Sequence, residues 1–418
     1  MTFDATDLTR ELDERLVGAD SALAQGFPGE RPDRQPVHTV YVPASRYDAG
    51  LVPRWGEEAL AVLDEHGGDA HAYAALLGIA PDLAEDVVGR VRAKLAAEPV
   101  EDLRIDFEDG YGAPADDVED AAVDASAAAL LESVRAGTAA PFHGIRFKSF
   151  EAPTRARGVR TLARFVEAVA ADGSLPEGFV VTLPKVTSVE QVEAMVVACE
   201  RIESGLGLRS GAMGFEIQVE TPQAILGPDG TALVARMVHA AAGRCTGLHY
   251  GTYDYSASLG VAAAYQSMEH PAADHAKAVM QVAAAGTGVR LSDGSTNILP
   301  VGSREAVHAA WALHARLVRR SLERGYYQGW DLHPAQLPSR YAATYAFYRE
   351  GLPAAAERLR NYVGQVDSGV MDEPATARAL ADFVVRGLDC GATDDAEVKE
   401  LTGIDRHRLD VLAKRVGG

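Results

Sequence analysis

The chain has 418 residues, 47% of them hydrophobic, and a formal net charge of −20 at pH 7. That length suits one large α/β barrel with additions, or two to three smaller domains. The negative charge argues against a nucleic acid or an anionic membrane as partner, because phosphate-rich surfaces would repel it. Sparse cysteines, a charged N-terminus and the lack of a long apolar run predict a cytoplasmic protein without disulfides or membrane spans.

Residues 1–36 form a lead-in, irregular over 26–36, and strand-like runs then alternate with helix-like runs. The predicted strands cover residues 37–45, 103–109, 143–150, 178–186, 214–221, 245–254, 290–298 and 326–334. The predicted helices between and after them cover residues 115–136, 154–172, 188–203, 231–242, 271–285, 303–324 and 339–362. A longer helical insertion at about 55–98 separates the first two strands.

This alternation predicts a parallel sheet, and eight strands are the number that closes a (β/α)8 TIM barrel. We therefore expect a barrel over 37–364 and a C-terminal helical segment, 365–418, that acts as a lid or an oligomerisation arm. A doubly wound open sheet is the rival, but its usual glycine-rich first turn does not match "VPASRYDAG".

Three of the predicted strands, 103–109, 143–150 and 214–221, carry apolar residues on one face and ionisable residues on the other. The apolar faces suit a helix layer, so the charged faces should meet inside the barrel, where they must neutralise one another. Arg104 and Glu216, deeper in their strands, are predicted to form a structural ion network. Catalytic groups of such barrels lie at the carboxyl ends of the strands, which favours function for Glu108, Asp109, Arg146 and Glu220.

The stretch "QVETPQAI", residues 218–225, places the Glu220 carboxylate at a strand end before a turn. Asp254, in "HYGTYDYSASLG", ends another strand and is the second ligand we expect, although a helix N-cap or turn role is the alternative. Two carboxylates, waters and a bidentate substrate suit Mg²⁺, with Mn²⁺ as a second choice of ion.

Eight motifs in order make the chain resemble the HpcH/HpaI aldolase and citrate lyase superfamily, in the style of citrate lyase β-subunit-like and malyl-CoA lyase-like proteins. The motifs are "VYVPASR" (40–46), "IDFEDGYG" (105–112), "GIRFKS" (144–149), "LPKV" (183–186), "VETPQAI" (219–225), "YGTYDYSASLG" (250–260), "GWDLHPAQL" (329–337) and "SGVMDEP" (368–374).

The resemblance implies a (β/α)8 barrel that holds Mg²⁺ through Glu220 and Asp254 and cleaves or forms a C–C bond beside a carbonyl. It implies that Arg146 binds the substrate carboxylate or carbonyl. It also implies that Asp372 reaches into the site of a neighbouring subunit, which predicts trimers or hexamers.

The chemistry of a retro-aldol cleavage suits the same residues. A guanidinium stabilises a developing oxyanion, and a carboxylate such as Asp372 can exchange a proton with the enolate. Glu108 and Asp109 are expected to hold metal-bound waters and to orient Arg146.

The remaining polar groups are assigned to substrate binding: Tyr253, Arg46 and Lys185. Lys148 and Lys185 are expected to be ion-pairing partners, with Schiff-base formation as the alternative.

The predicted function is a Mg²⁺-dependent C–C lyase or aldolase acting on a small hydroxy or keto acid, free or as a CoA thioester. Where thioester-using relatives carry a lysine after the first motif this chain has Val52, so CoA use stays open. Two alternatives remain: a metal-dependent hydrolase of malyl-type thioesters, and a non-catalytic metabolite-binding barrel.

Overall fold

Eight parallel strands form one sheet in the order β7-β6-β5-β4-β3-β2-β1-β8 in the computed structural model, which describes residues 5–364 and 373–415. The strands are β1 (His38–Pro43), β2 (Asp102–Asp106), β3 (Phe142–Arg146), β4 (Phe179–Leu183), β5 (Gly214–Val219), β6 (Cys245–Tyr250), β7 (Arg290–Ser292) and β8 (Gly329–Asp331).

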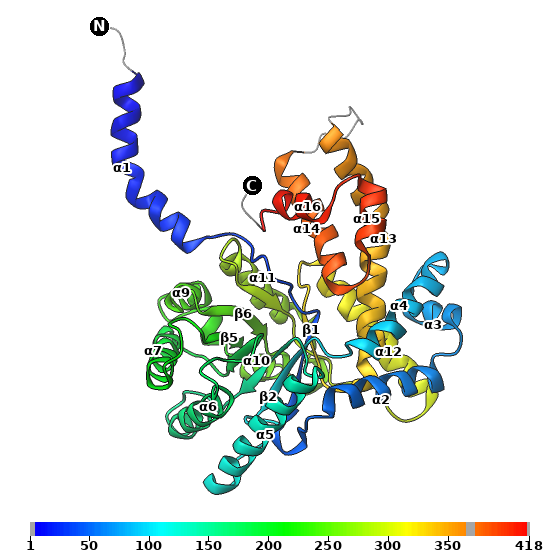
Figure 1. Ribbon diagram of the computed structural model, residues 1–418, viewed down its shortest axis with the longest axis horizontal. Helices are drawn as coiled ribbons and strands as arrows, with labels where there is room; N and C mark the ends of the chain where they lie inside the picture. The colour runs from blue at the N-terminus through cyan, green and yellow to red at the C-terminus, as the bar shows by residue number, and fades with distance from the viewer. Residues whose placement is uncertain (1–4, 365–372, 416–418) are drawn as a thin grey trace.

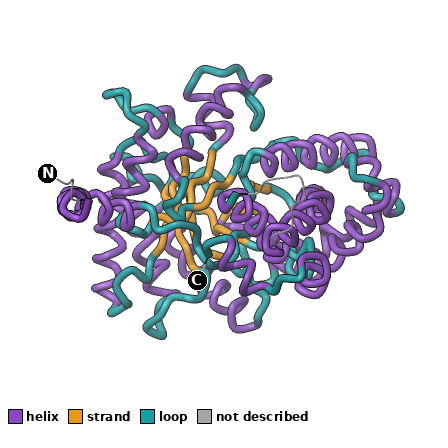
Figure 2. The backbone as a smooth tube through the Cα atoms, turned by 90° about the horizontal axis from the view of Figure 1, so that it is seen from above, coloured by secondary structure: helices purple, strands orange, loops and turns teal. Residues whose placement is uncertain are grey.

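The sheet closes on itself between its two outermost strands. The Asp293 amide donates to the Gln328 carbonyl at 2.8 Å, and the Trp330 amide donates to the Gly294 carbonyl at 3.3 Å. Seen from above, the strands lie at the centre of a ring of helices (Figure 2). The predicted (β/α)8 TIM barrel is therefore confirmed.

Helices follow the strands as predicted. The larger ones around the barrel are α5 (Asp116–Ala136), α6 (Arg155–Val169), α7 (Val189–Leu206), α9 (Leu233–Ala240), α11 (Pro271–Ala284), α12 (Arg304–Glu323) and α13 (Leu337–Gly364). Two short helices, α8 (Pro222–Ile225) and α10 (Thr252–Ser258), begin directly after β5 and β6. The insertion after β1 consists of α2 (Leu51–His66), α3 (Ala70–Leu77) and α4 (Ala84–Ala97).

Local sequence signals account for these boundaries. The α7 helix starts with a capping box in which Ser188 and Gln191 bond each other's backbone, and it ends at Gly207 in the left-handed region, with φ of 69°. Gly144 in β3 is required by close approach, because a Cβ there would lie 1.7 Å from the Val180 carbonyl oxygen. The second predicted strand stops at Asp106, so Glu108 and Asp109 lie in the following loop.

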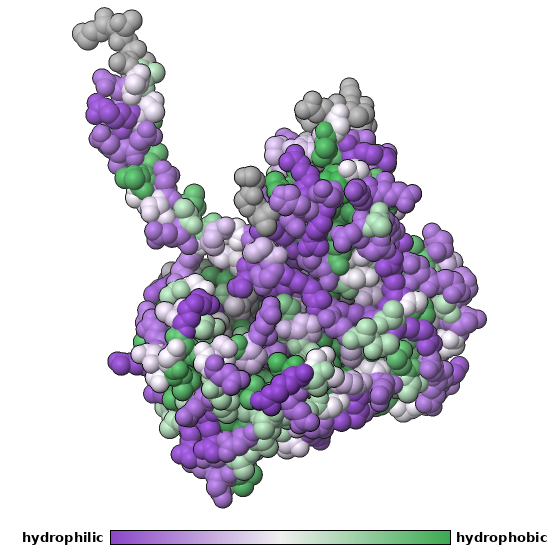
Figure 3. Space-filling model, viewed as in Figure 1, coloured by the Kyte–Doolittle hydropathy of each residue, from purple (hydrophilic) through white to green (hydrophobic). Residues whose placement is uncertain are grey.

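The lead-in contains a helix that the sequence pattern did not predict. The α1 helix (Ala5–Gly26) has no buried residue and projects away from the barrel (Figure 1). Its leucines, including Leu12 and Leu23, are exposed. Apolar surface accordingly appears along this projection in Figure 3. No helix of the described chain combines the length and apolarity needed to cross a bilayer.

The C-terminal segment is helical, as predicted, and comprises α14 (Pro374–Cys390), α15 (Asp395–Thr402) and α16 (Arg406–Leu412). These helices pack with α13 around a second apolar core that includes Leu352, Val385 and Leu409, in the lobe beside the barrel (Figure 1). Arg386 of α14 donates to the Gln35 side chain at 2.7 Å, just before β1. The described helices thus contact the amino-terminal side of the barrel, and their role as a lid or an arm stays a prediction.

Candidate active site

The lower interior of the barrel is an ion network, as predicted for Arg104 and Glu216. The fully buried Arg104 guanidinium donates to Glu216 Oε1 at 2.7 Å and also pairs with Asp102. Burial opposes ionisation of Glu216, but Arg104 and His249 outweigh it and lower the pKa of Glu216 to about 2. These groups satisfy one another, so they form structural support beneath the site.

Arg146 is held in a fixed orientation at the end of β3. Its Nε and Nη2 donate to the two oxygens of Asp106 at 2.8 and 2.7 Å, and its Nη1 donates to Gln218 Oε1 at 3.2 Å. The guanidinium carbon lies 4.7 Å from the Tyr41 ring centroid and 5.5 Å from that of Trp330. Although burial acts the other way, Asp106 raises the pKa of Arg146. Arg146 therefore presents a permanent positive charge.

Asp106 takes the orienting role that we expected of Glu108 and Asp109. Glu108 Oε2 lies 3.5 Å from Arg146 Nη1, which is an ion pair but not a hydrogen bond. The bidentate partner comes from β2 itself, where Asp106 is paired with Arg146 in the sheet register. Its position on the inward face was visible in the strand alternation.

A cluster of carboxylates, here called the acid cluster (Glu108, Asp109, Glu220 and Asp254), converges on Lys185. The Lys185 ammonium lies 2.7 Å from Asp109 Oδ2, 3.1 Å from Glu108 Oε1 and 3.2 Å from Asp254 Oδ2. The Lys185 backbone N–H donates to Glu220 Oε1 at 2.7 Å. The predicted ion-pairing role of Lys185 is thus what the structure shows.

The backbone at Lys185 is unusual, with φ of 51°, a left-handed conformation that non-glycine residues rarely adopt. In this conformation the backbone N–H and the side chain of Lys185 both point toward the acid cluster. Outliers of this kind concentrate at functional sites, where the surrounding structure enforces them.

Glu220 is buried at the end of β5, with 1% of its surface exposed. Its second oxygen accepts from Gln218 Nε2 at 2.7 Å. Burial first, and then Asp254 and Glu108, raises the pKa of Glu220 to about 8. Gly251 allows the adjoining chain to pass, because a Cβ there would lie 2.5 Å from Glu220 Cβ.

The other predicted residues lie apart from this centre or outside the described chain. The Tyr253 hydroxyl accepts from the Asn297 amide at 2.6 Å and so ties α10 to the loop after β7. Arg46 is exposed at the end of the turn after β1. Lys148 pairs with Glu119 at 2.6 Å, as an ion-pairing role predicted. Asp372 lies outside the described residues.

Residues 5–364 and 373–415 hold no group of three or more His, Cys, Asp or Glu side chains arranged to bind a metal. The acid cluster nevertheless fits a divalent cation in its chemistry. It offers oxygen donors, it already surrounds one positive charge, and the buried Glu108 Oε2 has no hydrogen-bond partner. A metal ion here would replace the Lys185 ammonium.

Sequence reasoning placed Asp106 and Gln218 on inward strand faces, with Asp106 among the charges that neutralise one another there, but gave neither a role in the site. It missed Tyr41 and Trp330. All four belong to barrel strands, and the rings of Tyr41 and Trp330 lie in contact, with centroids 4.2 Å apart and planes tilted by 43°. Alternation along the first and last strands carried the signal, because it places Tyr41 opposite the apolar Val40 and Val42.

The fold and site define a (β/α)8 barrel with an acid cluster and a fixed arginine at the carboxyl ends of its strands. Residues 16–416 match the family described as "Domain of unknown function (DUF6986)", so the chain belongs to that family. No curated protein matches it.

Several solved structures are similar. A citrate lyase from Burkholderia xenovorans LB400 is 19% identical with a TM-score of 0.59, over 89% of this chain and 98% of that one. A malate synthase from Haloferax volcanii, in a magnesium and glyoxylate complex, is 14% identical with a TM-score of 0.50, over 91% and 98%. At these identities the likeness concerns the fold. At that level it agrees with the barrel fold that the resemblance to the citrate lyase superfamily implied.

Proposed function

We propose that this protein is a Mg²⁺-dependent C–C lyase or aldolase that acts on a small hydroxy or keto acid through an enolate. The observation that carries the proposal is the convergence of Glu108, Asp109 and Asp254 on one cationic position. The arginine that would bind the substrate, Arg146, touches the same cluster through Glu108.

The acid cluster would hold the ion, with Glu220 and Asp254 as the protein ligands that the sequence suggested. When bound, Mg²⁺ supplies Lewis acidity that polarises the substrate carbonyl or hydroxyl. The Haloferax volcanii malate synthase, whose complex contains magnesium and glyoxylate, supports both the ion and the substrate class.

Arg146 would bind the substrate carboxylate or the developing oxyanion. Asp106 occupies its Nε and Nη2 edge, which leaves Nη1, now facing Gln218 and Glu108, to meet a substrate oxygen. Because Asp106 fixes the guanidinium beforehand, little side-chain entropy is lost when the substrate binds.

In the cleavage direction the C–C bond breaks and its electrons pass to the enolate. The hydroxyl proton passes to a carboxylate, for which Asp372 is the candidate, as the new carbonyl forms. Arg146 stabilises the charge that develops on oxygen. Lys185, once released from the acid cluster, is available to neutralise a second carboxylate of the substrate. Asp372 is the candidate for proton exchange with the enolate carbon, supplied from a neighbouring subunit of a trimer or hexamer.

Product analysis tests the proposal. Purified protein with Mg²⁺ is incubated with a panel of hydroxy acids and their CoA thioesters, and release of a keto acid or aldehyde is followed by chromatography. Carbonyl product that depends on Mg²⁺ and is lost in Arg146→Gln supports the lyase. A free acid and thiol without carbonyl product would favour the thioester hydrolase, and binding without turnover would favour the metabolite-binding barrel.

A further inference from the structure

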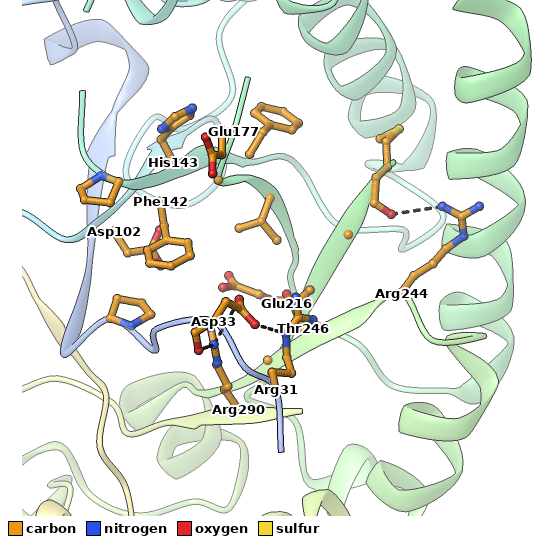
Figure 4. Close-up of a pocket in the computed structure, with 18 of the residues that line it drawn as sticks. Arg31, Asp33, Asp102, Phe142, His143, Glu177, Glu216, Arg244, Thr246 and Arg290 are labelled. Carbon is orange, nitrogen blue, oxygen red and sulfur yellow. Dashed lines mark hydrogen bonds and ion pairs between the residues drawn. The ribbon is translucent and has the colours of Figure 1, made fainter. Parts of the chain in front are cut away.

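A cavity of about 1060 Å³ opens at the amino-terminal ends of the strands, on the side of the barrel away from the acid cluster. Its wall includes Asp102, Phe142, Phe179 and Gly214, which begin β2, β3, β4 and β5. The segment 31–36, which leads into β1, contributes another wall (Figure 4). The volume is comparable to that of small-molecule sites in proteins.

Small residues leave this end of the barrel unfilled. Side chains two residues apart on a strand share a face, so the positions next to inward-facing Arg104 and Glu216 also face inward. Gly144 pairs with Arg104 and Gly247 pairs with Glu216 in the sheet register, and Gly214 lies two residues before Glu216 on β5. Gly214 and Gly247 line the cavity, whereas Gly144 is required by its close approach to Val180. Barrel interiors are normally packed in layers of bulky side chains, so the two lining glycines leave space instead.

Two arginines at one end of the cavity share a single carboxylate. Arg31 Nε lies 3.1 Å from Asp33 Oδ1, and Arg290 Nη2 lies 3.1 Å from Asp33 Oδ2 (Figure 4). Their two positive charges are matched by one negative charge. The other acids of the cavity do not compensate: Asp102 and Glu216 belong to the Arg104 network, Glu200 acts on Arg244, and Glu177 lies across the cavity in the close-up.

The state of Arg290 agrees with this excess of positive charge. Burial lowers the pKa of Arg290 to about 10, and Arg31, Arg386 and Arg415 act in the same direction against Asp33. The other arginines of the described chain with a perturbed pKa have it raised by acidic partners, as the buried Arg104 does. A bound anion beside Arg290 would supply the negative partner that the other buried arginines have.

We propose that this cavity is a second ligand site, separate from the acid cluster, that binds a compact polyanion through Arg31 and Arg290. A guanidinium pair of this kind recognises either a phosphate ester or a polycarboxylate, because both offer paired oxygens to planar N–H donors. Since the chain carries a net charge of −20, binding must depend on these local cations and weaken with salt.

Isothermal titration calorimetry of the full, metal-free chain with pyrophosphate and with citrate tests the site. We expect saturable binding of one of these probes at one per chain, and the stronger probe identifies the phosphate or the carboxylate class. Arg31→Gln, whose side chain is 38% exposed and tolerant of change, should weaken binding at least tenfold. Arg290→Gln should do the same. Arg146→Gln, at the other end of the barrel, should leave the affinity unchanged.

Hydrogen exchange of the wild-type protein locates the ligand without any variant. The stronger probe should slow exchange in residues 31–36 and at the start of β5. Absence of saturable binding by both probes overturns the proposal. So does binding that Arg146→Gln abolishes, or protection that appears at 106–109 instead. Because the titration uses metal-free protein and no turnover, it can fail while the lyase proposal stands, and the reverse also holds.

Discussion

In the proposed function, the Lys185 ammonium and the divalent cation compete for the same carboxylates, so replacing Lys185 should tighten metal binding. Lys185→Met keeps much of the side-chain volume and removes the charge that competes with the ion. Its ion pair with the buried Glu108, at 3.1 Å, is worth about 2 kcal/mol. The pairs with Asp109 and Asp254, whose side chains are 55% and 51% exposed, are worth about 0.5 kcal/mol each after solvent screening.

Metal binding by the wild-type protein must break these contacts, a total of about 3 kcal/mol, so the variant should bind Mn²⁺ about 100-fold more tightly. Electron paramagnetic resonance titration with Mn²⁺ at pH 8 measures the affinity directly. Lys399→Met, an exposed position on α15 with the same change of charge, is the matched control and should leave it unaltered. Turnover of Lys185→Met should nevertheless fall, because the freed lysine assists the substrate. If Lys185→Met bound Mn²⁺ no more tightly than the wild type, the proposed competition between Lys185 and the metal ion would be refuted.

Three further predictions concern the interior, pH and the tail. Arg104→Met should destabilise the fold by about 3–5 kcal/mol in urea unfolding, because it leaves the buried carboxylates of Asp102 and Glu216 without a cationic partner. Adding Glu216→Gln should recover part of the lost stability. An unchanged free energy of unfolding in Arg104→Met would show that the network is dispensable. The second prediction concerns metal-free protein in EDTA. Because the pKa of Glu220 is raised to about 8, the folded protein holds this proton more tightly than the unfolded chain does. Protonated Glu220 therefore stabilises the fold below about pH 4.5, and this contribution disappears as the pH rises to about 8. The free energy of unfolding should fall less between pH 5 and pH 8.5 in Glu220→Gln than in the wild type. Identical pH profiles of the two proteins would contradict the raised pKa of Glu220. Asp372→Ala should lower turnover while Mn²⁺ affinity and oligomeric state stay unchanged, and full turnover would remove the tail from catalysis.

Much of the barrel and the charged lining of its interior could be predicted from sequence periodicity. Alternation at a period of two placed Arg104, Arg146 and Glu216 on inward faces, and the order of strands and helices predicted the closure. Periodicity reveals regular strands and helices, and the barrel consists of eight strands that alternate with helices.

Contacts between strands were harder to predict, because alternation does not specify which inward residues meet. The bidentate pairing of Asp106 with Arg146 depends on the register of β2 against β3. The convergence of the acid cluster on Lys185 depends on one left-handed backbone angle. The cavity depends on the starts of several strands and on the segment 31–36, which meet only once the barrel has closed.

The proposed function requires that the acid cluster bind one divalent cation beside Arg146. Titration of Mn²⁺ into the wild-type protein and into Glu220→Gln, followed by electron paramagnetic resonance, tests it most directly. We expect one saturable site per chain in the wild type and its loss in the variant, which should remain folded by circular dichroism. Equal binding by both proteins, or no saturable binding by the wild type, would contradict it.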